Sequence, residues 1–203
     1  MSLLFRFCIS AILFLIIVTT FSQDKVSFQQ YTELVQQYKE ADKIYHQAEV
    51  IAEEEDVDEK LQDELNQQAL NKFQTLLTAL QNSPNDSLAF FTHLKTGILH
   101  HYFGNMVKAN HHYNHSIALK DKLKTLTDSF LFKPYLYSGI IYYNQNKFDS
   151  ALLRYKQAET ITDGYSTKLN ESERLFNNLG ALFYEAGNYR QAKNYFEKAI
   201  TTL

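Results

Sequence analysis

The chain has 203 residues, of which 45% are hydrophobic. Its 20 basic and 23 acidic side chains give a formal net charge of −3 with no arginine-rich face, so nucleic acid is not expected as a partner. Six glycines and two prolines leave few points where helices must break, and no stretch alternates with a period of two. The composition therefore favours an all-α protein.

Residues 1–22 have the pattern of a secretory signal peptide. After Arg6 no charge occurs before Asp24, and the apolar run of residues 7–18 is followed by small residues ending at Ser22. This pattern predicts cleavage after Ser22 and export to a periplasmic or extracellular location, with no membrane attachment afterwards. The alternative is an uncleaved N-terminal helix that anchors the chain, although the run is short for a full membrane span.

The single cysteine, Cys8, lies inside the hydrophobic run and not at its end, where a lipoprotein would carry its lipid. A mature chain beginning at residue 23 would contain no cysteine. It could then form no disulfide, thiol nucleophile or thiolate metal site.

Residues 23–83 are expected to form a helix pair, with helices at about 27–53 and 57–81 and an acidic turn between them. The turn lacks the ligand spacing of a calcium-binding loop. Ala69 followed by Phe73 repeats a small-then-aromatic pair that recurs later in the chain, so we interpret the pair as a degenerate N-terminal unit. A free-standing amphipathic pair or coiled-coil partner is the alternative.

The remaining residues, 84–203, contain three stretches that align at a spacing of 41 to 42 residues. Each has a glycine, then an alanine twelve positions on, then an aromatic residue four positions later. The triplets are Gly97/Ala109/Tyr113, Gly139/Ala151/Tyr155 and Gly180/Ala192/Phe196. Such self-similarity predicts helix pairs that stack on one another, with units at about 90–123, 132–165 and 173–203. Glycine and alanine allow close helix crossings, and the aromatic is expected to fill the core beside them.

The third copy resembles the tetratricopeptide repeat (TPR), whose signature places aromatic, Leu-Gly, aromatic, Ala, Phe and Ala over a helix-turn-helix. It offers Phe176, Leu179-Gly180, Phe183, Ala192, Phe196 and Ala199. The second copy departs at Ser138, and the first has His93, Thr96, His100 and Ser116 at signature positions. The resemblance implies antiparallel helix pairs stacked as a right-handed TPR α-solenoid after an N-terminal signal peptide.

The turn residues agree with this register. Gly104-Asn105, Asn144-Gln145-Asn146 and Gly187-Asn188 recur between the two helices of each unit, where a left-handed residue ends a helix. Asn170, with Glu173 three residues later, is predicted to be an N-cap with its capping-box partner.

In the TPR family, positions 2, 5, 9 and 12 of each unit line a concave groove that binds a partner. The resemblance assigns this role to Phe91, Leu94, Ile98, His101, Lys133, Leu136, Ile140, Tyr143, Arg174, Asn177, Ala181 and Tyr184. This set is apolar and aromatic at one end and polar at the other, which favours a protein or peptide partner with an apolar anchor. Several members, such as Phe91, Leu94 and Ile140, can equally pack against neighbouring helices. Leu94 and Ile98 replace the Lys and Asn of a chaperone-type carboxylate clamp, so that ligand class is disfavoured.

Six of the seven histidines lie between residues 93 and 115. His111 and His115 are one helical turn apart, a spacing that can chelate zinc or copper if a third ligand is near. By register both lie on the outer face of the second helix, while His101 points to the concave side and His100 takes a core aromatic position. We interpret the histidines as a polar helix face and predict no metal site.

No nucleophile elbow, zinc-protease motif, phosphate loop or dinucleotide fingerprint occurs in the sequence. We therefore expect no catalytic residue and no cofactor, and a chain that is not an enzyme by itself. Its leading interpretation is a non-catalytic scaffold or sensor module.

The exported repeats also resemble the N-terminal region of Bacteroidetes-type proteins, in which TPR units precede a caspase-like CHAT peptidase domain or a sensor histidine kinase. On this alternative the chain is a regulatory fragment of a larger enzyme whose catalytic domain lies beyond Leu203. The last helix lacks a polar capping helix, which also allows self-association there.

Overall fold

The computed structural model describes residues 3–53, 56–165 and 169–202, with side chains from residue 28 onward. Every regular element in these ranges is a helix, as the composition predicts. The elements are α1 (Leu3–Ala52), α2 (Glu59–Asn82), α3 (Asp86–Tyr102), α4 (Met106–Lys120), the 3₁₀-helix η1 (Asp128–Leu131), α5 (Phe132–Asn144), α6 (Phe148–Asp163), α7 (Ser172–Glu185) and α8 (Tyr189–Thr201).

The predicted signal peptide, residues 1–22, lies outside the part of the chain whose side chains are described, so cleavage and export stay predictions. Within the described part, no helix is both long enough and apolar enough to cross a membrane. The chain divides into two compact units, Met1–Pro84 and Asn85–Leu203.

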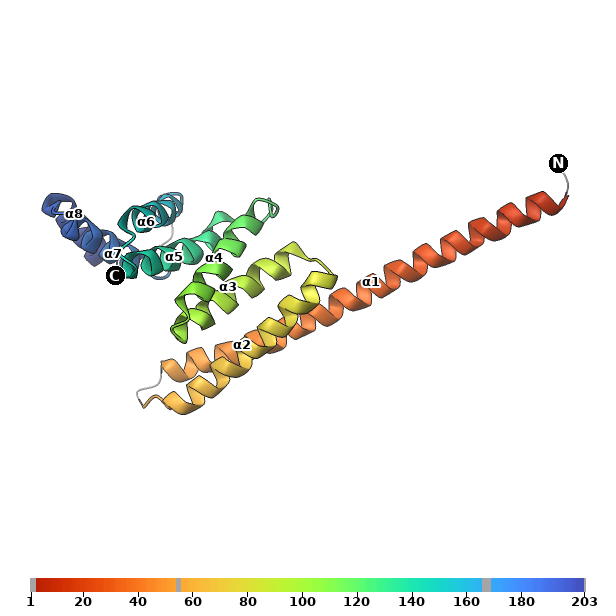
Figure 1. Ribbon diagram of the computed structural model, residues 1–203, viewed down its shortest axis with the longest axis horizontal. Coiled ribbons are helices and arrows are strands. Elements are labelled where there is room, and N and C mark those ends of the chain that lie inside the picture. Colours follow the sequence, from red (N-terminus) through yellow and green to blue (C-terminus); the bar gives the residue numbers. More distant parts are fainter. Residues whose placement is uncertain (1–2, 54–55, 166–168, 203) are drawn as a thin grey trace. The chain divides into compact units, whose positions relative to one another are not determined.

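The first unit is a hairpin of α1 and α2 (Figure 1). Small and apolar side chains at helical spacing form its contact, and the predicted pair Ala69 and Phe73 is fully buried. Asp58 caps α2 by accepting a 2.9 Å hydrogen bond from the backbone N–H of Leu61. The buried apolar residues are Leu34, Ala41, Tyr45 and Ala48 on α1 and Ala69, Leu70, Phe73, Leu76 and Leu80 on α2.

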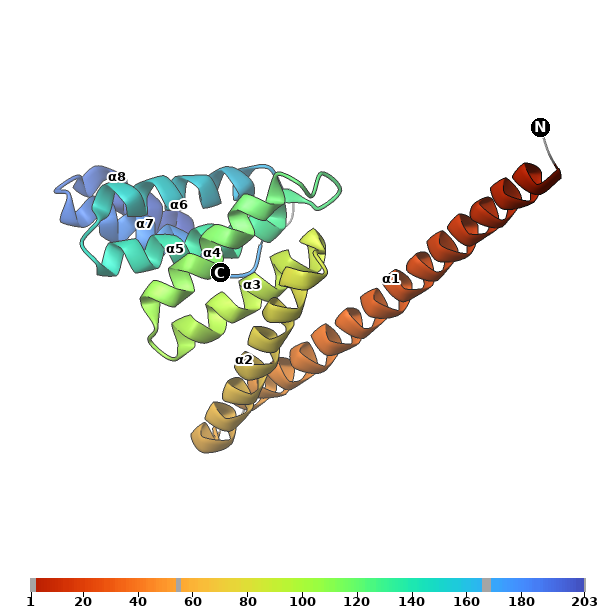
Figure 2. The same ribbon diagram turned by 45° about the vertical axis from the view of Figure 1, so that its right-hand side comes forward.

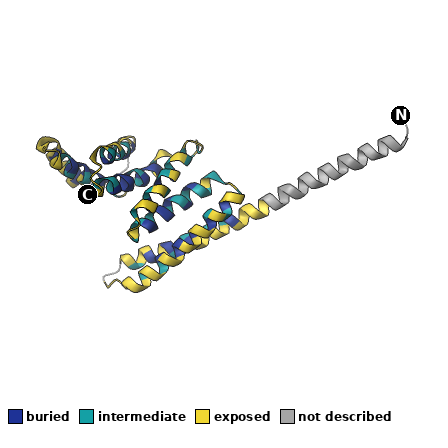
Figure 3. Ribbon diagram, viewed as in Figure 1, coloured by how far each residue is buried: buried dark blue, intermediate teal, exposed yellow. Residues whose placement is uncertain are grey.

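The second unit consists of three helix pairs, α3–α4, α5–α6 and α7–α8, which follow one another along the chain (Figures 1 and 2). We call them repeats 1, 2 and 3. Within each pair the helices pack closely, and α4 also packs on α5 and α6 on α7. One continuous cluster of buried residues runs through all three repeats, along the inner sides of the helices (Figure 3). A core shared between neighbours is what a repeat array needs, because no single pair can bury its apolar face alone.

The glycine of each triplet lies against the aromatic ring 16 residues further on. A Cβ at Gly97, Gly139 or Gly180 would lie 2.7, 2.5 or 2.6 Å from a carbon of that ring, closer than side chains approach. The intervening alanines, Ala109, Ala151 and Ala192, are buried at the same crossings. Repeated glycines in the sequence therefore mark the points of closest approach between the two helices of each repeat.

The turn between the helices is the same in all three repeats. Gly104, Asn146 and Gly187 have φ angles of 71°, 59° and 73°, which is the left-handed conformation predicted for these positions. Asparagine tolerates this conformation better than other non-glycine residues, and this explains its use in repeat 2.

The start of α7 differs from the sequence-based prediction of an Asn170 cap. The helix begins at Ser172, and the N-cap residue is Glu171, whose φ of 70° is left-handed. No side chain caps the helix, because the Glu171 carboxylate is directed to residues of α5 and α7. The prediction of an Asn170 N-cap was wrong: the N-cap position falls one residue later, on the left-handed Glu171, whose carboxylate pairs with Lys133 of α5 instead of capping the helix.

Phe196, the aromatic of the triplet in repeat 3, is less buried than the sequence pattern implies. Tyr113 and Tyr155 are 0% exposed, whereas Phe196 is 37% exposed. Tyr113 is covered on its second side by Tyr137 of α5, with 5.7 Å between ring centroids. A cavity at Phe196 would therefore be smaller than one at either tyrosine.

We expect the substitution Gly139→Ala to lower the free energy of unfolding by roughly 1–3 kcal/mol, since the added methyl group would overlap the buried Tyr155 ring. Gly164→Ala is the matched control, because a Cβ there meets nothing closer than 3.5 Å. Urea unfolding followed by circular dichroism measures both. Equal midpoints for the two variants would contradict the close crossing.

Candidate functional site

The predicted groove positions fall into two groups in the structure. Leu94 and Leu136 are 8% and 0% exposed, so both belong to the core. The remaining positions are half-buried or exposed and lie on α3, α5 and α7, the first helix of each repeat. The proposed partner surface therefore depends on the remaining positions.

Aromatic side chains gather at the repeat 1 end of this set. Phe91 of α3 makes edge-to-face contacts with Phe90 and with Phe130 of η1, each with 5.2 Å between ring centroids. Phe130 keeps 42% of its surface exposed. Exposed aromatic surface held in a fixed geometry is a typical anchor site for a partner, because little side-chain entropy is lost on binding.

Charged side chains gather at the other end, around the Glu171 carboxylate. Tyr137 donates a 2.7 Å hydrogen bond to Glu171 Oε1, and Lys133 Nζ lies 3.1 Å from the same oxygen. Arg174 Nη1 lies 3.2 Å from Oε2, and its guanidinium is 5.6 Å from the centroid of the Tyr137 ring. The carboxylate at the start of α7 is thus joined to α5 by two donors, Tyr137 and Lys133, and is held on its own helix by Arg174.

The pKa of Glu171 reflects this environment. Burial by itself would raise the pKa of this carboxyl group, but the hydrogen bond from Tyr137 and the positive charges of Lys133 and Arg174 bring it below its ordinary value. Glu171 is therefore ionised at neutral pH, and it neutralises part of the positive charge at this end of the set.

His101 joins the charged end to repeat 1. Its ring meets Tyr137 edge-on with 5.8 Å between centroids. Burial, with the positive charge of Arg174 as a further cause, lowers its pKa from the ordinary value. The imidazole is therefore neutral at physiological pH, so it can donate one hydrogen bond and accept another.

Sequence reasoning missed Phe130, Tyr137 and Glu171. Phe130 and Glu171 are 41 residues apart and lie at equivalent positions, just before the first helix of repeat 2 and of repeat 3. Each side chain contacts the residue at position 2 of the preceding repeat. Their contacts are Phe130 with Phe91 and Glu171 with Lys133. Extending the repeat alignment backward from each helix could have shown these equivalent positions, but not the directions of their side chains.

His111 and His115, expected on the outer face of α4, are exposed, and His100, expected at a core aromatic position, is 3% exposed. Among the residues that the structure describes, no group of three or more His, Cys, Asp or Glu side chains is arranged to hold a metal ion. The possible zinc spacing of His111 and His115 therefore has no third ligand in the described part of the chain.

Several solved structures share this fold at low sequence identity. BtubC (BKLC) from P. vanneervenii superposes with a TM-score of 0.59 at 16% identity, covering 81% of this chain and 72% of that one. MamA gives 0.51 at 17% identity over 68% of each chain, and the TPR domain of Arabidopsis FLU gives 0.52 at 17% identity, covering 58% of this chain and 96% of that domain. No protein-family model and no curated protein sequence matches the chain. These likenesses, with the helix pairs described above, identify the fold as that of a TPR α-solenoid.

We expect Tyr137→Phe to lower the free energy of unfolding by roughly 1–2 kcal/mol, because it removes a hydrogen bond to an ionised, half-buried carboxylate. Tyr184→Phe removes the same atom from a side chain that is 58% exposed and is the matched control. Thermal unfolding of both variants makes the comparison. A Tyr137→Phe midpoint equal to that of the control would show that the Glu171 cluster does not stabilise the array.

Proposed function

We propose that this protein is a non-catalytic interaction scaffold or sensor module that binds a peptide or protein segment along the concave side of its TPR array. The observation that carries the proposal is the joint placement of an aromatic cluster and a charged cluster on the first helices of consecutive repeats. The TPR fold shared with these solved structures supports the same interpretation, since the groove of TPR proteins is a partner-binding surface.

The two clusters favour a particular kind of partner. Phe91 and Phe130 can hold an apolar side chain, and burial of such an anchor supplies most of the affinity in peptide recognition. Lys133, Glu171 and Arg174 present both signs of charge, so they favour a polar segment next to the anchor and fix its direction. A continuous run of apolar residues would leave these charges desolvated and is disfavoured.

The proposal predicts that peptides selected from a random display library bind the groove. We expect Phe91→Ala and Tyr143→Ala each to weaken binding by at least tenfold, because each removes aromatic contact surface. Val107→Ala, on an α4 side chain that is 80% exposed, is the control. Fluorescence anisotropy with labelled peptide gives the Kd, and circular dichroism checks that each variant is folded.

The opposite pattern would overturn the groove assignment. Selected peptides that lose affinity with Val107→Ala, but not with the two aromatic variants, would place the binding surface on another face of the array. A library that yields no binder to the folded chain would count against peptide recognition altogether.

The proposal also includes export, with cleavage after Ser22, and allows a regulatory role within a longer protein that has a CHAT peptidase or sensor kinase domain. The exposure of Tyr189, Phe196 and Ile200 on α8, at 64%, 37% and 68%, supports contact with a further helix or with a second copy.

Intact mass and N-terminal sequencing of the native protein from its own cells test these points. We expect a mature N-terminus at Gln23, since the apolar run is too short for a stable membrane span. An intact Met1 would favour the anchored alternative. A native mass far above that of residues 23–203 would favour the regulatory arm of a larger protein, and a matching mass would favour a self-standing scaffold.

A further inference from the structure

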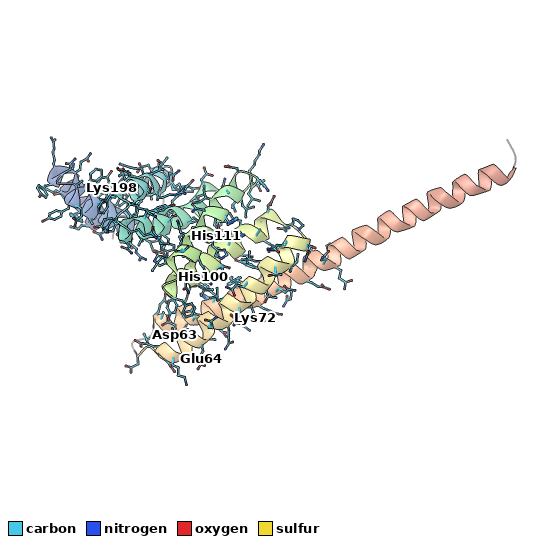
Figure 4. All side chains as sticks on the ribbon, in the orientation of Figure 1. Asp63, Glu64, Lys72, His100, His111 and Lys198 are labelled. Carbon is cyan, nitrogen blue, oxygen red and sulfur yellow. The ribbon has the colours of Figure 1, made fainter. Side chains whose placement is uncertain are left out.

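Five histidines of the two helices of repeat 1 contact one another, three of them buried or half-buried between the helices and two, His111 and His115, exposed at the edge of the contact. We call them the histidine cluster, which consists of His93 and His100 on α3 and His111, His112 and His115 on α4. The Nδ1 atoms of His93 and His112 are 2.9 Å apart, within hydrogen-bonding distance. The His93 ring stacks on His115 with 4.8 Å between centroids and an interplanar angle of 11°. Figure 4 labels His100 and His111 on this helix pair.

The cluster continues through two further ring contacts. His100 stacks on His112 with 5.4 Å between centroids, and His111 meets His115 at 4.4 Å. The imidazoles therefore form one contact network that joins α3 to α4.

The other repeats use different chemistry at the same positions. His93, His100 and His112 correspond to Tyr135, Tyr142 and Arg154 in repeat 2 and to Phe176, Phe183 and Tyr195 in repeat 3. In repeat 2 the Arg154 guanidinium lies 5.6 Å from the centroid of the Tyr135 ring, and in repeat 3 Phe183 stacks on Tyr195 at 5.4 Å. These contacts join the two helices of their repeats and do not change charge between pH 5 and 8. Repeat 1 alone of the three places titratable imidazoles there.

The hydrogen bond between His93 and His112 limits their protonation. One Nδ1 donates its hydrogen, and the other must accept with a free lone pair. If both rings were imidazolium ions, both Nδ1 atoms would carry hydrogens, the bond would be lost, and two positive charges would face each other at contact distance. The packed state therefore requires that at least one of the two rings is neutral.

The surroundings also favour neutral rings. Burial, with the charges of His115 and His111, lowers the pKa of His93 to about 4. Burial, together with the charges of the other four members of the cluster, lowers the pKa of His112 to about 3. Burial, with the positive charge of Lys108 on α4 as a further cause, lowers the pKa of His100.

No carboxylate among the described residues contributes to these pKa values. The described helices that pack against α4 carry two carboxylates, Asp86 of α3 and Asp128 of η1, and each already lies beside a lysine, Asp86 at 3.7 Å from Lys122 Nζ. Asp128 of η1 is paired with Lys120 at 2.7 Å, and Lys133 of α5 is paired with Glu171. A positive charge on the histidine cluster would therefore be opposed by burial and by the neighbouring cations, with no carboxylate in the described part of the chain placed to stabilise it.

We infer that the histidine cluster is an acid-sensitive lock on repeat 1, which holds α3 against α4 at neutral pH and releases them when the cluster takes up protons. Opening would displace Phe91, Ile98 and His101, which are the contribution of α3 to the proposed groove. A partner bound there would then be released on acidification. This last step rests on the proposed function, whereas the opening of repeat 1 does not.

The sign of the effect follows from proton linkage. The folded state holds the histidines neutral, while the unfolded repeat binds protons at the ordinary histidine pKa of about 6.5, so the closed form loses stability as the pH falls below that value. Each of His93 and His112 should raise the fraction of molecules with repeat 1 open by roughly tenfold between pH 7.5 and pH 5.0. This figure is below the full linkage effect because the rings keep some contact with solvent. Repeats 2 and 3 lack the cluster and should change less, since a repeat array can open one unit at a time.

Hydrogen exchange of the full chain at pH 7.5 and pH 5.0, corrected for intrinsic exchange rates, tests the lock. We expect protection in α3 and α4 to fall at least tenfold more than protection in α5 to α8. The variant H93F/H112Y, which transfers the repeat 3 residues Phe176 and Tyr195 to repeat 1, should abolish this difference. H46N, which removes an exposed histidine on α1, is the control and should behave as wild type. Equal loss of protection in wild type and H93F/H112Y would overturn the inference.

If H93F/H112Y does not fold, histidine Cε1 resonances of the wild-type chain, followed from pH 8 to pH 4 by NMR, decide the matter. Two cluster histidines that titrate well below 6.5, with loss of α3 and α4 signal dispersion at the same pH, support the lock. Five histidines that titrate near 6.5 without structural change overturn it.

The release step is measured with a groove-binding peptide selected at pH 7.5. We expect the wild-type chain to lose at least tenfold in affinity at pH 5.0 and H93F/H112Y to keep it. His101 is present in both proteins, so its own titration cancels in the comparison. A peptide that binds equally at both pH values overturns the release step, and failure of all peptides to bind at pH 7.5 counts against the proposed function while the exchange result still judges the lock.

Discussion

The close crossing between the two helices of each repeat is the contact on which the rest of the array depends. Gly97, Gly139 and Gly180 have no side chain where the aromatic of the second helix presses against the first, and any Cβ there would overlap a ring. The helix pairs can therefore approach at the same depth three times in succession. Because each repeat has the same close crossing and the same turn with one left-handed residue, the first helix of every repeat lies in an equivalent position.

This regularity explains why the aromatic and the charged cluster lie at corresponding places in successive repeats. The first helices α3, α5 and α7 present corresponding positions in turn. At the starts of α5 and α7, a residue just before the helix reaches back toward the preceding repeat. In one case that residue is Phe130, which extends an aromatic cluster, and in the other it is Glu171, which collects two cations and a tyrosine hydroxyl. Equivalent positions thus carry an aromatic side chain in one repeat and a carboxylate in the next. The two ends of the array therefore differ in chemistry although the backbone repeats.

The departures from the repeat signature are as informative as the matches. Histidines in repeat 1 stand where repeats 2 and 3 have tyrosine, phenylalanine or arginine, and they still join the two helices. Histidine at these positions retains ring stacking but makes it depend on protonation, since a stacked pair of neutral imidazoles becomes a pair of like charges in acid. A position that is structural in two repeats is therefore sensitive to pH in the third.

The sequence by itself determined the helical class, the repeat register, the three close crossings and the left-handed turn at Gly104, Asn146 and Gly187, because each depends on backbone contacts that only certain residue types permit. Its prediction of a cap at Asn170 failed, and it named neither Tyr137 nor Phe130 as part of the charged and aromatic clusters. It also did not foresee that His93 and His112 meet. These features depend on where side chains from different helices converge. Only the tertiary structure decided them, because an ion pair or a ring contact across helices can outweigh the local preference of the residues that make it.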